Sequence, residues 1–352
     1  MIPTPTKEEA AALIKARAHD LGFAVCGIAR ADVPLELEFA RYEDALANGF
    51  HGPLDYLARN VEVRRRLDTD AILEGAKSVI VVGARYDRPD DADDPPLAQK
   101  IARYARGHDY HGFMRKKIRK LAELVRTFGA EARPMSDTAP VLERAWAARA
   151  GIGFLGKNGL IIAPGQGSTM LLGEVVTTLE LATDEPIEER CGRCTLCLDA
   201  CPTGAFVRPF VLDASKCVST ATIEQRGQIP VFLRAAASET LFGCDICQEV
   251  CPHNAKSRPE APLGSRHRPH ERWSTTTLEQ LAQIGMEGSV SFEELAVGTP
   301  LSRPGPEGLA RNACLALAHV EGSEPLLQSI AERHPSEVVR DAARWALYHR
   351  PE

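Results

Sequence analysis

The chain has 352 residues, of which 44% are hydrophobic and 26% are charged, and its formal net charge at pH 7 is -6. A chain of this size buries a sizeable core and divides into about two or three domains. The negative charge excludes a protein that coats nucleic acid indiscriminately, but not one with a local basic footprint. We find neither a signal peptide nor an apolar run of the roughly 18 residues that span a membrane. We therefore expect a cytoplasmic protein without a membrane partner.

The first region, residues 1–180, alternates helical and strand patterns. The helix expected over residues 7–23 stops at Gly22. The strand expected over residues 78–86 is apolar throughout, which is typical of strands buried on both faces of a sheet. The expected helices cover residues 7–23 and 110–129, and the expected strands cover residues 24–29, 78–86, 160–164 and 169–181. Strands separated by helices predict an α/β domain. Neither a dinucleotide-binding fingerprint nor a phosphate loop is present in the sequence.

The segment SDTAPVLERAWAARAGIGFLGKNGL suggests one helix with a possible functional start. Pro140 suits the first turn of a helix and Gly151 suits its end, while Ser136, Asp137 and Thr138 are residues of the kind that cap helices. Asp137 is therefore either a cap or a catalytic proton donor, and the spacing leaves both open. The glycine-rich segment that follows predicts a hairpin, whose glycines also let the backbone approach a large ligand closely.

Eight of the ten cysteines lie in the second region, residues 181–262. CGRCTLCLDACPTGA matches the bacterial ferredoxin run, in which three thiolates hold one 4Fe-4S cluster and the fourth holds a second cluster. GCDICQEVCPHN repeats its last three positions, and Cys217 fills the missing first one. Symmetry predicts one cluster on Cys191, Cys194, Cys197 and Cys251, and another on Cys201, Cys217, Cys244 and Cys247. A zinc site would instead need paired CxxC knuckles. Cys26 and Cys314 are expected to be core residues.

The third region, residues 263–352, is expected to be helical. RNACLALA at 311–318 and RDAARWAL at 340–347 share an Arg, an Asn or Asp and an Ala at an offset of 29 residues. That offset suggests HEAT-like stacking, although a plain helical hairpin explains two copies equally well. Two basic runs, at 59–66 and 115–120, are either solvated helix faces or parts of a nucleic-acid footprint.

Several blocks in this order resemble the epoxyqueuosine reductase family over nearly the whole chain. They are RYARGHDYHGFMRKKI, SDTAPVLER, AGIGFLGKNGLI with the following GQGS and LGE, KCVSTATIEQRGQIP and the two cysteine runs. The resemblance implies that the N-terminal domain binds cobalamin beside two 4Fe-4S clusters. It also implies reduction of epoxyqueuosine to queuosine at the wobble position of tRNAs with GUN anticodons, the last step of queuosine biosynthesis. The implied partners are a tRNA anticodon stem-loop and a low-potential electron donor, and we expect a monomer.

Individual residues fall on the family's functional positions. Asp137 falls on the proton donor, and the eight clustered cysteines fall on the cluster ligands. Candidate cobalamin contacts are Tyr104, Asp109, Asp137, Lys157, Asn158 and Ser168, with Ser219, Gln225 and Arg226 as further contacts to cobalamin or tRNA. Thr220 and Ala221 stand where the family often has a bulky aromatic residue.

Proteins that ligate cobalamin through a histidine typically carry a DxHxxG pattern. DYHGF at 109–113 comes nearest to it but does not have the glycine at the required place. We therefore expect base-off cobalamin without a protein histidine ligand, and hence a strongly reducing cobalt. Opening an epoxide leaves an alkoxide, which Asp137 can protonate if burial raises its pKa toward neutrality. Two other functions stay open at this point: a corrinoid-dependent reductive dehalogenase, and an iron-sulfur electron-transfer or corrinoid-activating protein.

Overall fold

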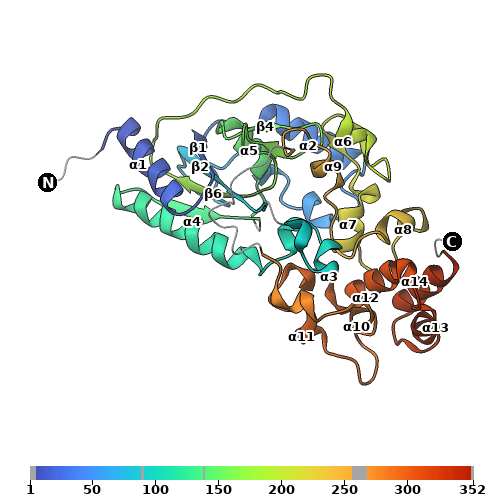
Figure 1. Cartoon of the computed structure of the whole chain (residues 1–352). Coiled ribbons are helices and arrows are strands. Elements are labelled where there is room, and N and C mark those ends of the chain that lie inside the picture. Colours follow the sequence, from blue (N-terminus) through green and yellow to red (C-terminus); the bar gives the residue numbers. More distant parts are fainter. Residues whose placement is uncertain (1–4, 89–90, 138, 256–267, 350–352) are drawn as a thin grey trace.

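The computed structural model describes residues 5–88, 91–137, 139–255 and 268–349 (Figure 1). Thr138, one of the expected cap residues, lies outside the described residues. Helices and strands alternate in the first part of the chain, and the C-terminal part is helical.

Four strands form the central sheet, in the order β1-β2-β6-β3. They are β1 (Val25–Arg30), β2 (Ser78–Arg85), β3 (Ala132–Met135) and β6 (Met170–Thr177). Every neighbouring pair is antiparallel. The expected α/β region therefore alternates helices and strands, and the described strands of its sheet form no parallel pair of the kind that βαβ crossovers produce. The connection between β1 and β2 explains this. It leaves β1 and enters β2 at the same end of the sheet, so the last residue of β1, Arg30, lies opposite the first residue of β2, Ser78.

Helices cover both faces of this sheet (Figure 1). Helices α1 (Lys7–Asp20) and α4 (Tyr110–Thr127) pack on one face, and α5 (Glu143–Arg149) packs on the other. Successive side chains of a strand point to opposite faces, so Ile80 contributes to the first core and Val79 to the second. All of β2 is buried, as expected from its apolar run.

Helix α5 begins at Glu143 rather than near Pro140. Leu142 occupies its N-cap position without a side-chain hydrogen bond, so the interpretation of Asp137 as the cap of this helix is wrong. The predicted end is confirmed, because Ala150 is the C-cap and Gly151 follows with a φ of 70°. Asp137 thus belongs to a connection between β3 and α5, where it can serve another purpose.

The short hairpin of β4 (Phe154–Leu155) and β5 (Ile161–Ile162) follows α5, as the glycine-rich segment predicts. Two short helices, α6 and α9, each lie within a cysteine run and contact one another (Figure 1). The elements of this region are α6 (Leu196–Asp199), β7 (Phe206–Arg208), β8 (Val211–Leu212), α7 (Val218–Ile223), α8 (Val231–Ala237) and α9 (Ile246–Glu249). Earlier short helices are α2 (Glu36–Ala47), α3 (Pro96–Gln99) and the 3-10 turns Asp55–Ala58, Glu62–Arg65, Asp91–Asp93 and Arg103–Ala105.

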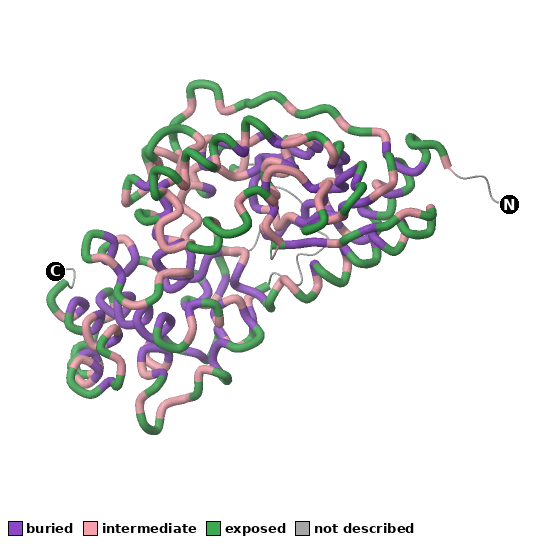
Figure 2. Tube along the Cα trace, turned by 180° about the vertical axis from the view of Figure 1, so that it is seen from behind, coloured by how far each residue is buried: buried purple, intermediate pink, exposed green. Residues whose placement is uncertain are grey.

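The C-terminal region is helical, as expected. Its α-helices are α10 (Leu278–Ala282), α11 (Phe292–Ala296), α12 (Gly305–Ala316), α13 (Glu324–Arg333) and α14 (Glu337–Tyr348). Figure 2 shows buried residues gathered in the sheet and among these helices. One hydrophobic core joins them to side chains from residues 97–105 and 221–242. Because this core crosses two of the predicted limits, the division into 1–180, 181–262 and 263–352 stays a prediction.

Arg311 of α12 links the C-terminal region to the insertion between the cluster cysteines. It is 1% exposed, and its guanidinium donates hydrogen bonds to the backbone oxygens of Ala221, Gln225 and Gly227. The Asn312 amide donates to carbonyls of the same insertion and of the segment after α8. The Arg and Asn of the first repeated segment therefore hold α7 and the turn behind it in place.

We expect Arg311→Met to destabilise the protein by about 3 kcal/mol or more, because each buried carbonyl that loses its donor costs about 1–3 kcal/mol. Arg340→Met is the matched control at the equivalent position of the second segment. Arg340 pairs with the exposed Glu337 and donates to the carbonyls of His334 and Pro335 near the surface, so its loss should cost only about 1–2 kcal/mol. Thermal unfolding of both variants with their clusters in place measures the difference. Equal stability of the two variants would contradict the role given to Arg311.

Candidate active site

A cavity of about 480 Å³ lies where the end of the sheet meets the cysteine region. Its lining combines apolar and aromatic side chains with a few polar groups, as cofactor sites do. Five of the predicted cofactor contacts line it: Tyr104, Asp137, Asn158, Ser168 and Ser219. Cys217, Cys244 and Cys247, three cysteines assigned to one cluster, line the same cavity. The structure therefore brings the predicted proton donor and one predicted cluster site to a common space.

Asp137 stands in the left-handed region of backbone conformation, with a φ of 60°. Few residues other than glycine adopt this conformation, and Asp is among those that tolerate it. The Tyr110 hydroxyl donates to Asp137 Oδ2 over 3.1 Å, and His111 Nε2 lies 2.8 Å from the same oxygen. Both donors come from the first turn of α4. The start of α4 thus fixes the carboxyl group of Asp137 at the cavity wall.

His111 lies between two carboxyl groups, since its Nδ1 is 2.6 Å from Asp109 Oδ1 and its Nε2 contacts Asp137. These hydrogen bonds raise the pKa of His111 to about 9. The bond from His111 in turn lowers the pKa of Asp137, and this effect exceeds the opposing effect of burial. The condition under which Asp137 was expected to act, a pKa raised toward neutrality, is therefore not met. At neutral pH the proton lies on His111, and Asp137 shares it through a hydrogen bond.

Two further carboxyl groups, Glu143 and Glu174, lie behind Asp137. The Asp137 amide donates to Glu143 Oε1 over 2.6 Å, and Glu143 also lines the cavity. Burial raises the pKa of Glu143 to about 7 and holds the pKa of Glu174, which is 0% exposed, well above its ordinary value. The sequence patterns did not single out His111, Glu143 or Glu174 as functional residues. An acid inside the apolar run of β6 is a signal that could have found Glu174, because Glu is almost never fully buried unless it is paired.

Four predicted cofactor contacts are placed outside the cavity lining. Asp109 caps α4 by accepting a hydrogen bond from the His111 amide, so its side chain contacts His111 and does not form part of the cavity wall. Lys157 donates to the carbonyls of Gly192 and Cys194 in the first cysteine run. The remaining two contact backbone oxygens: Gln225 donates to Arg226, and Arg226 donates to Arg303 and Pro304.

The first predicted cluster site is a cavity of about 180 Å³, lined by Cys191, Cys194, Cys197 and Cys251. These are the four cysteines that symmetry assigned to one cluster. Among the described residues, no three His, Cys, Asp or Glu side chains are arranged around a single metal ion. All ten cysteines are free thiols. Cys314 is fully buried and Cys26 partly buried, in keeping with the core positions expected for them.

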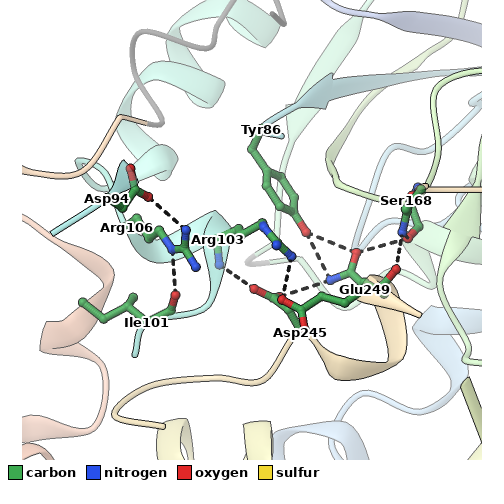
Figure 3. A network of polar contacts seen from close by, with 10 residues as sticks. Tyr86, Asp94, Ile101, Arg103, Arg106, Ser168, Asp245 and Glu249 are labelled. Carbon is green, nitrogen blue, oxygen red and sulfur yellow. Dashed lines mark hydrogen bonds and ion pairs between the residues drawn. The ribbon is translucent and has the colours of Figure 1, made fainter. Parts of the chain in front are cut away.

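A polar network joins the second cysteine run to the sheet region (Figure 3). Asp245 accepts from the Arg103 amide over 2.7 Å, and Glu249 pairs with the Arg103 guanidinium over 2.9 Å. Gln248 contacts both the Tyr86 hydroxyl, at 3.3 Å, and Ser168 Oγ, at 3.1 Å. Ser168 thus anchors the glycine-rich segment to α9, and the network fixes the cysteine region against the cavity.

A basic groove of about 680 Å³ follows α4 away from the active site. It is lined by Arg115, Lys116, Arg119 and Lys120, with Asp109 and His111 at one end. His111 belongs both to this groove and to the Asp137 pair. The other basic run, at 59–66, has a structural use, because Arg64 donates to a backbone carbonyl and Arg65 and Arg66 form ion pairs.

Comparison with known proteins identifies two family domains within the chain. Residues 190–254 match the family described as 4Fe-4S double cluster binding domain. Residues 66–138 match the family described as Epoxyqueuosine reductase QueG, DUF1730. A curated epoxyqueuosine reductase from Pseudomonas aeruginosa is 37% identical over 356 residues, which cover 97% of this chain and 95% of that protein. The chain belongs to the epoxyqueuosine reductase family.

Other members of the family agree over the same extent. The epoxyqueuosine reductase of Xanthomonas campestris is 37% identical over 98% of this chain and 97% of its own length. A crystal structure of an epoxyqueuosine reductase with an epoxyqueuosine-modified stem loop of tyrosine tRNA superposes with a TM-score of 0.83 and 32% identity, covering 96% of this chain and 88% of that one. The Bacillus subtilis member, whose structure has a catalytic aspartate loop swung out of the active site, gives the same TM-score.

Family membership supports the first of the three functions that the sequence left open. The double-cluster domain also confirms iron-sulfur chemistry for the cysteine region. None of the described helices is long and apolar enough to cross a membrane.

The described residues fit the two kinds of cofactor. The small cavity offers a thiol from each of four cysteines, the donor set of a 4Fe-4S cluster. The large cavity offers apolar surface from Leu171 and Leu172 beside aromatic Tyr104, which suits a large flat ring, and its polar groups suit amide side chains on such a ring. No group with a positive charge other than Arg144 lines it, so a neutral or cationic ring meets no cluster of cations among the described lining residues.

Proposed function

We propose that this chain reduces epoxyqueuosine to queuosine at the wobble position of tRNAs with GUN anticodons. The observation that carries the proposal is the placement of Asp137, which contacts His111 behind it, at one wall of a cavity that Cys244 and Cys247 also line. The family membership of the chain supports the substrate. A dehalogenase or a pure electron-transfer protein would not need the basic groove that begins at His111.

One of the protons of the reaction can be assigned to this chain's residues. Reduction of an epoxide to an alkene takes up two electrons and two protons and releases one water molecule. When bound, the clusters supply the electrons and cobalamin supplies the strongly reducing cobalt. His111 holds a proton at Nε2, against Asp137 Oδ2, and Asp137 passes it to the oxygen that is freed when the ring opens. The Asp109 carboxylate keeps the imidazole oriented, because it accepts from the opposite ring nitrogen.

The cofactor assignments follow the lining of the two cavities. We propose Cys191, Cys194, Cys197 and Cys251 as ligands of one cluster and Cys201, Cys217, Cys244 and Cys247 as ligands of the other. Tyr104, Asn158, Ser168 and Ser219 are proposed to contact cobalamin, with Asp109, Lys157, Gln225 and Arg226 acting on the walls around it. We propose that cobalamin binds base-off, without a protein histidine ligand. The electron donor is proposed to be a low-potential protein or small reductant, and the enzyme to act as a cytoplasmic monomer.

The tRNA is proposed to reach the active site along the basic groove of α4. Phosphates of the anticodon stem would pair with cations such as Arg119, while the modified base leaves its stack and enters the cavity beside Asp137. The C-terminal helices lie next to the same opening, since Arg303 is held by Glu224 and its charge acts on Asp137. HEAT-like stacking of α12 and α14 would extend this surface.

We expect Arg119→Ala to weaken tRNA binding and to lower the slope of log affinity against log salt by about 0.9, the value for one lost phosphate contact on a duplex stem. Arg65→Ala is the matched control, because Arg65 is an exposed arginine that pairs with Glu36. Binding of an anticodon stem-loop at several salt concentrations, measured by fluorescence anisotropy, gives both slopes. An unchanged slope in Arg119→Ala would place the stem elsewhere.

The test of the proposed function is a chemical conversion. The cluster-loaded protein is incubated without oxygen with cobalamin, a strong reductant and tRNA that carries epoxyqueuosine. Queuosine is the expected product, and tRNA with unmodified guanine at the wobble position should stay unchanged.

A further inference from the structure

Two carboxyl groups behind Asp137 have no part in the proton transfer proposed above. Glu174 lies in β6 with 0% of its surface exposed, and neither of its carboxyl oxygens has a hydrogen-bond partner among the described residues. Glu143, the first residue of α5, faces it. An ionised carboxylate in the protein interior is costly unless it is paired. At least one of the two carboxyl groups is therefore expected to be neutral.

The surroundings of the pair offer little compensation. The charged groups that act on Glu143 are Arg144, Asp137 and Glu174, and those that act on Glu174 are Glu143 and Asp137. Arg144 is the one cation in this set, and its guanidinium points to a different partner, the carbonyl of Gly159. Two carboxyl groups in this situation can satisfy each other by sharing a proton, as the paired acids of aspartic proteases do.

We propose that Glu143 and Glu174 share a single proton and that this pair positions Asp137. The connection is the hydrogen bond from the Asp137 amide to Glu143 Oε1. Glu174 pairs in the sheet with Met135, the last residue of β3, so the pair adjoins the start of the Asp137 connection. Glu143 and Glu174 thus each hold part of the connection that carries Asp137, whose φ is unfavourable for a residue other than glycine. The proposal deepens the proposed function and rests on it for the role of Asp137.

Loss of the shared proton should release this arrangement. Two facing carboxylates repel each other, so Glu143 would turn away and the Asp137 amide would lose its acceptor. Burial raises the pKa of Glu143 from 4.5 to about 7. A carboxyl whose pKa is raised by folding stabilises the protein fully below its unfolded pKa, and this stabilisation disappears as the pH rises through the folded pKa. The contribution of Glu143 should therefore decline between about pH 4.5 and pH 7, while Glu174, whose pKa is held well above its ordinary value, keeps the single proton of the pair above that range.

Glutamine substitutions test the shared proton without removing the hydrogen bonds. In Glu174→Gln the new amide N–H donates permanently to Glu143, which can still accept from Asp137. Glu131→Gln is the matched control, since Glu131 is exposed at the edge of the same sheet. At pH 8, above the pKa of Glu143, we expect the infrared C=O band of a protonated carboxylic acid in the cluster-loaded wild type and in the control, and its loss in Glu174→Gln. The fall in unfolding temperature between pH 4.5 and pH 7 should become shallower in the same variant. An unchanged band and slope in Glu174→Gln would overturn the shared proton.

Turnover separates positioning from a merely structural role. Glu143→Gln keeps an acceptor for the Asp137 amide and should stay within about threefold of wild type at pH 6.5, whereas Glu143→Ala should lose about 100-fold in turnover, the cost of a small misplacement. Equal turnover of the two variants would overturn the positioning role. Because the infrared and unfolding measurements need no substrate, an inactive wild type with the expected band would contradict the proposed function and leave the shared proton supported.

Discussion

Replacement of Asp137 by Asn should lower turnover by a factor of about 10² to 10⁴, the range that a positioned acid contributes. The amide can accept the hydrogen bond from His111 but cannot pass the proton on. Single-turnover rates at saturating tRNA measure the loss, and the absorbance of the clusters shows whether they remain in place. Turnover at the wild-type rate with intact cofactors would exclude Asp137 as the donor.

The same variant should change the titration of His111. That imidazole owes its pKa of about 9 first to Asp109 and then to Asp137, so the loss of one carboxylate should bring the pKa down toward its ordinary value. Nuclear magnetic resonance titration of the histidine ring follows this shift without any substrate. If Asp137→Asn lost activity but the pKa of His111 did not change, the proton transfer by Asp137 would not depend on its ion pair with His111.

Removal of the Cys217 thiol should eliminate one cluster and abolish turnover while the other cluster persists. Cys217 is the one of the eight clustered cysteines that lies outside the two runs, yet it lines the cavity together with Cys244 and Cys247. Since the second cluster is proposed to pass electrons to the active site, we expect Cys217→Ala to retain about half of the iron and less than about 1% of the activity. Iron analysis and electron paramagnetic resonance of the reduced protein measure both clusters.

Cys26→Ala is the matched control for this substitution, because Cys26 is a partly buried thiol in β1. Its iron content and activity should equal those of the wild type. Retention of both clusters in Cys217→Ala would show that another residue completes the second site.

The regular elements of the sheet region could be predicted because their patterns are local. The apolar run of β2 and the glycine stop after α5 each depend on a few neighbouring residues. The start of α5 could not be predicted, because a proline and three cap-type residues ahead of a helix are compatible with more than one starting point. The antiparallel pairing of β1 with β2 was equally hidden, since the intervening residues give no sign of which end of the sheet they return to.

The cysteine sets are a prediction from fixed spacing, because a cluster demands thiolates at set intervals and symmetry between two runs carries the assignment; the cavity lined by Cys191, Cys194, Cys197 and Cys251 agrees with it. The environment of Asp137 could not be predicted. His111 is far from Asp137 in sequence, and only the meeting of α4 with the β3–α5 connection places the two side chains 2.8 Å apart. The pKa of Asp137 follows from that contact, which is why the expected rise is in fact a decrease. Glu143 begins helix α5 and is half of a pair whose other member, Glu174, lies on strand β6, so its role likewise depends on the tertiary fold.

The most direct measurement of the central claim is nucleoside mass analysis of epoxyqueuosine-containing tRNA after anaerobic incubation with the reduced, cluster-loaded protein. Parallel incubations omit cobalamin or the reductant. With all components present, the modified nucleoside should lose one oxygen atom and elute as queuosine, and each omission should leave it unchanged. Epoxyqueuosine that persists in the complete mixture, or queuosine that forms without cobalamin, would contradict the account.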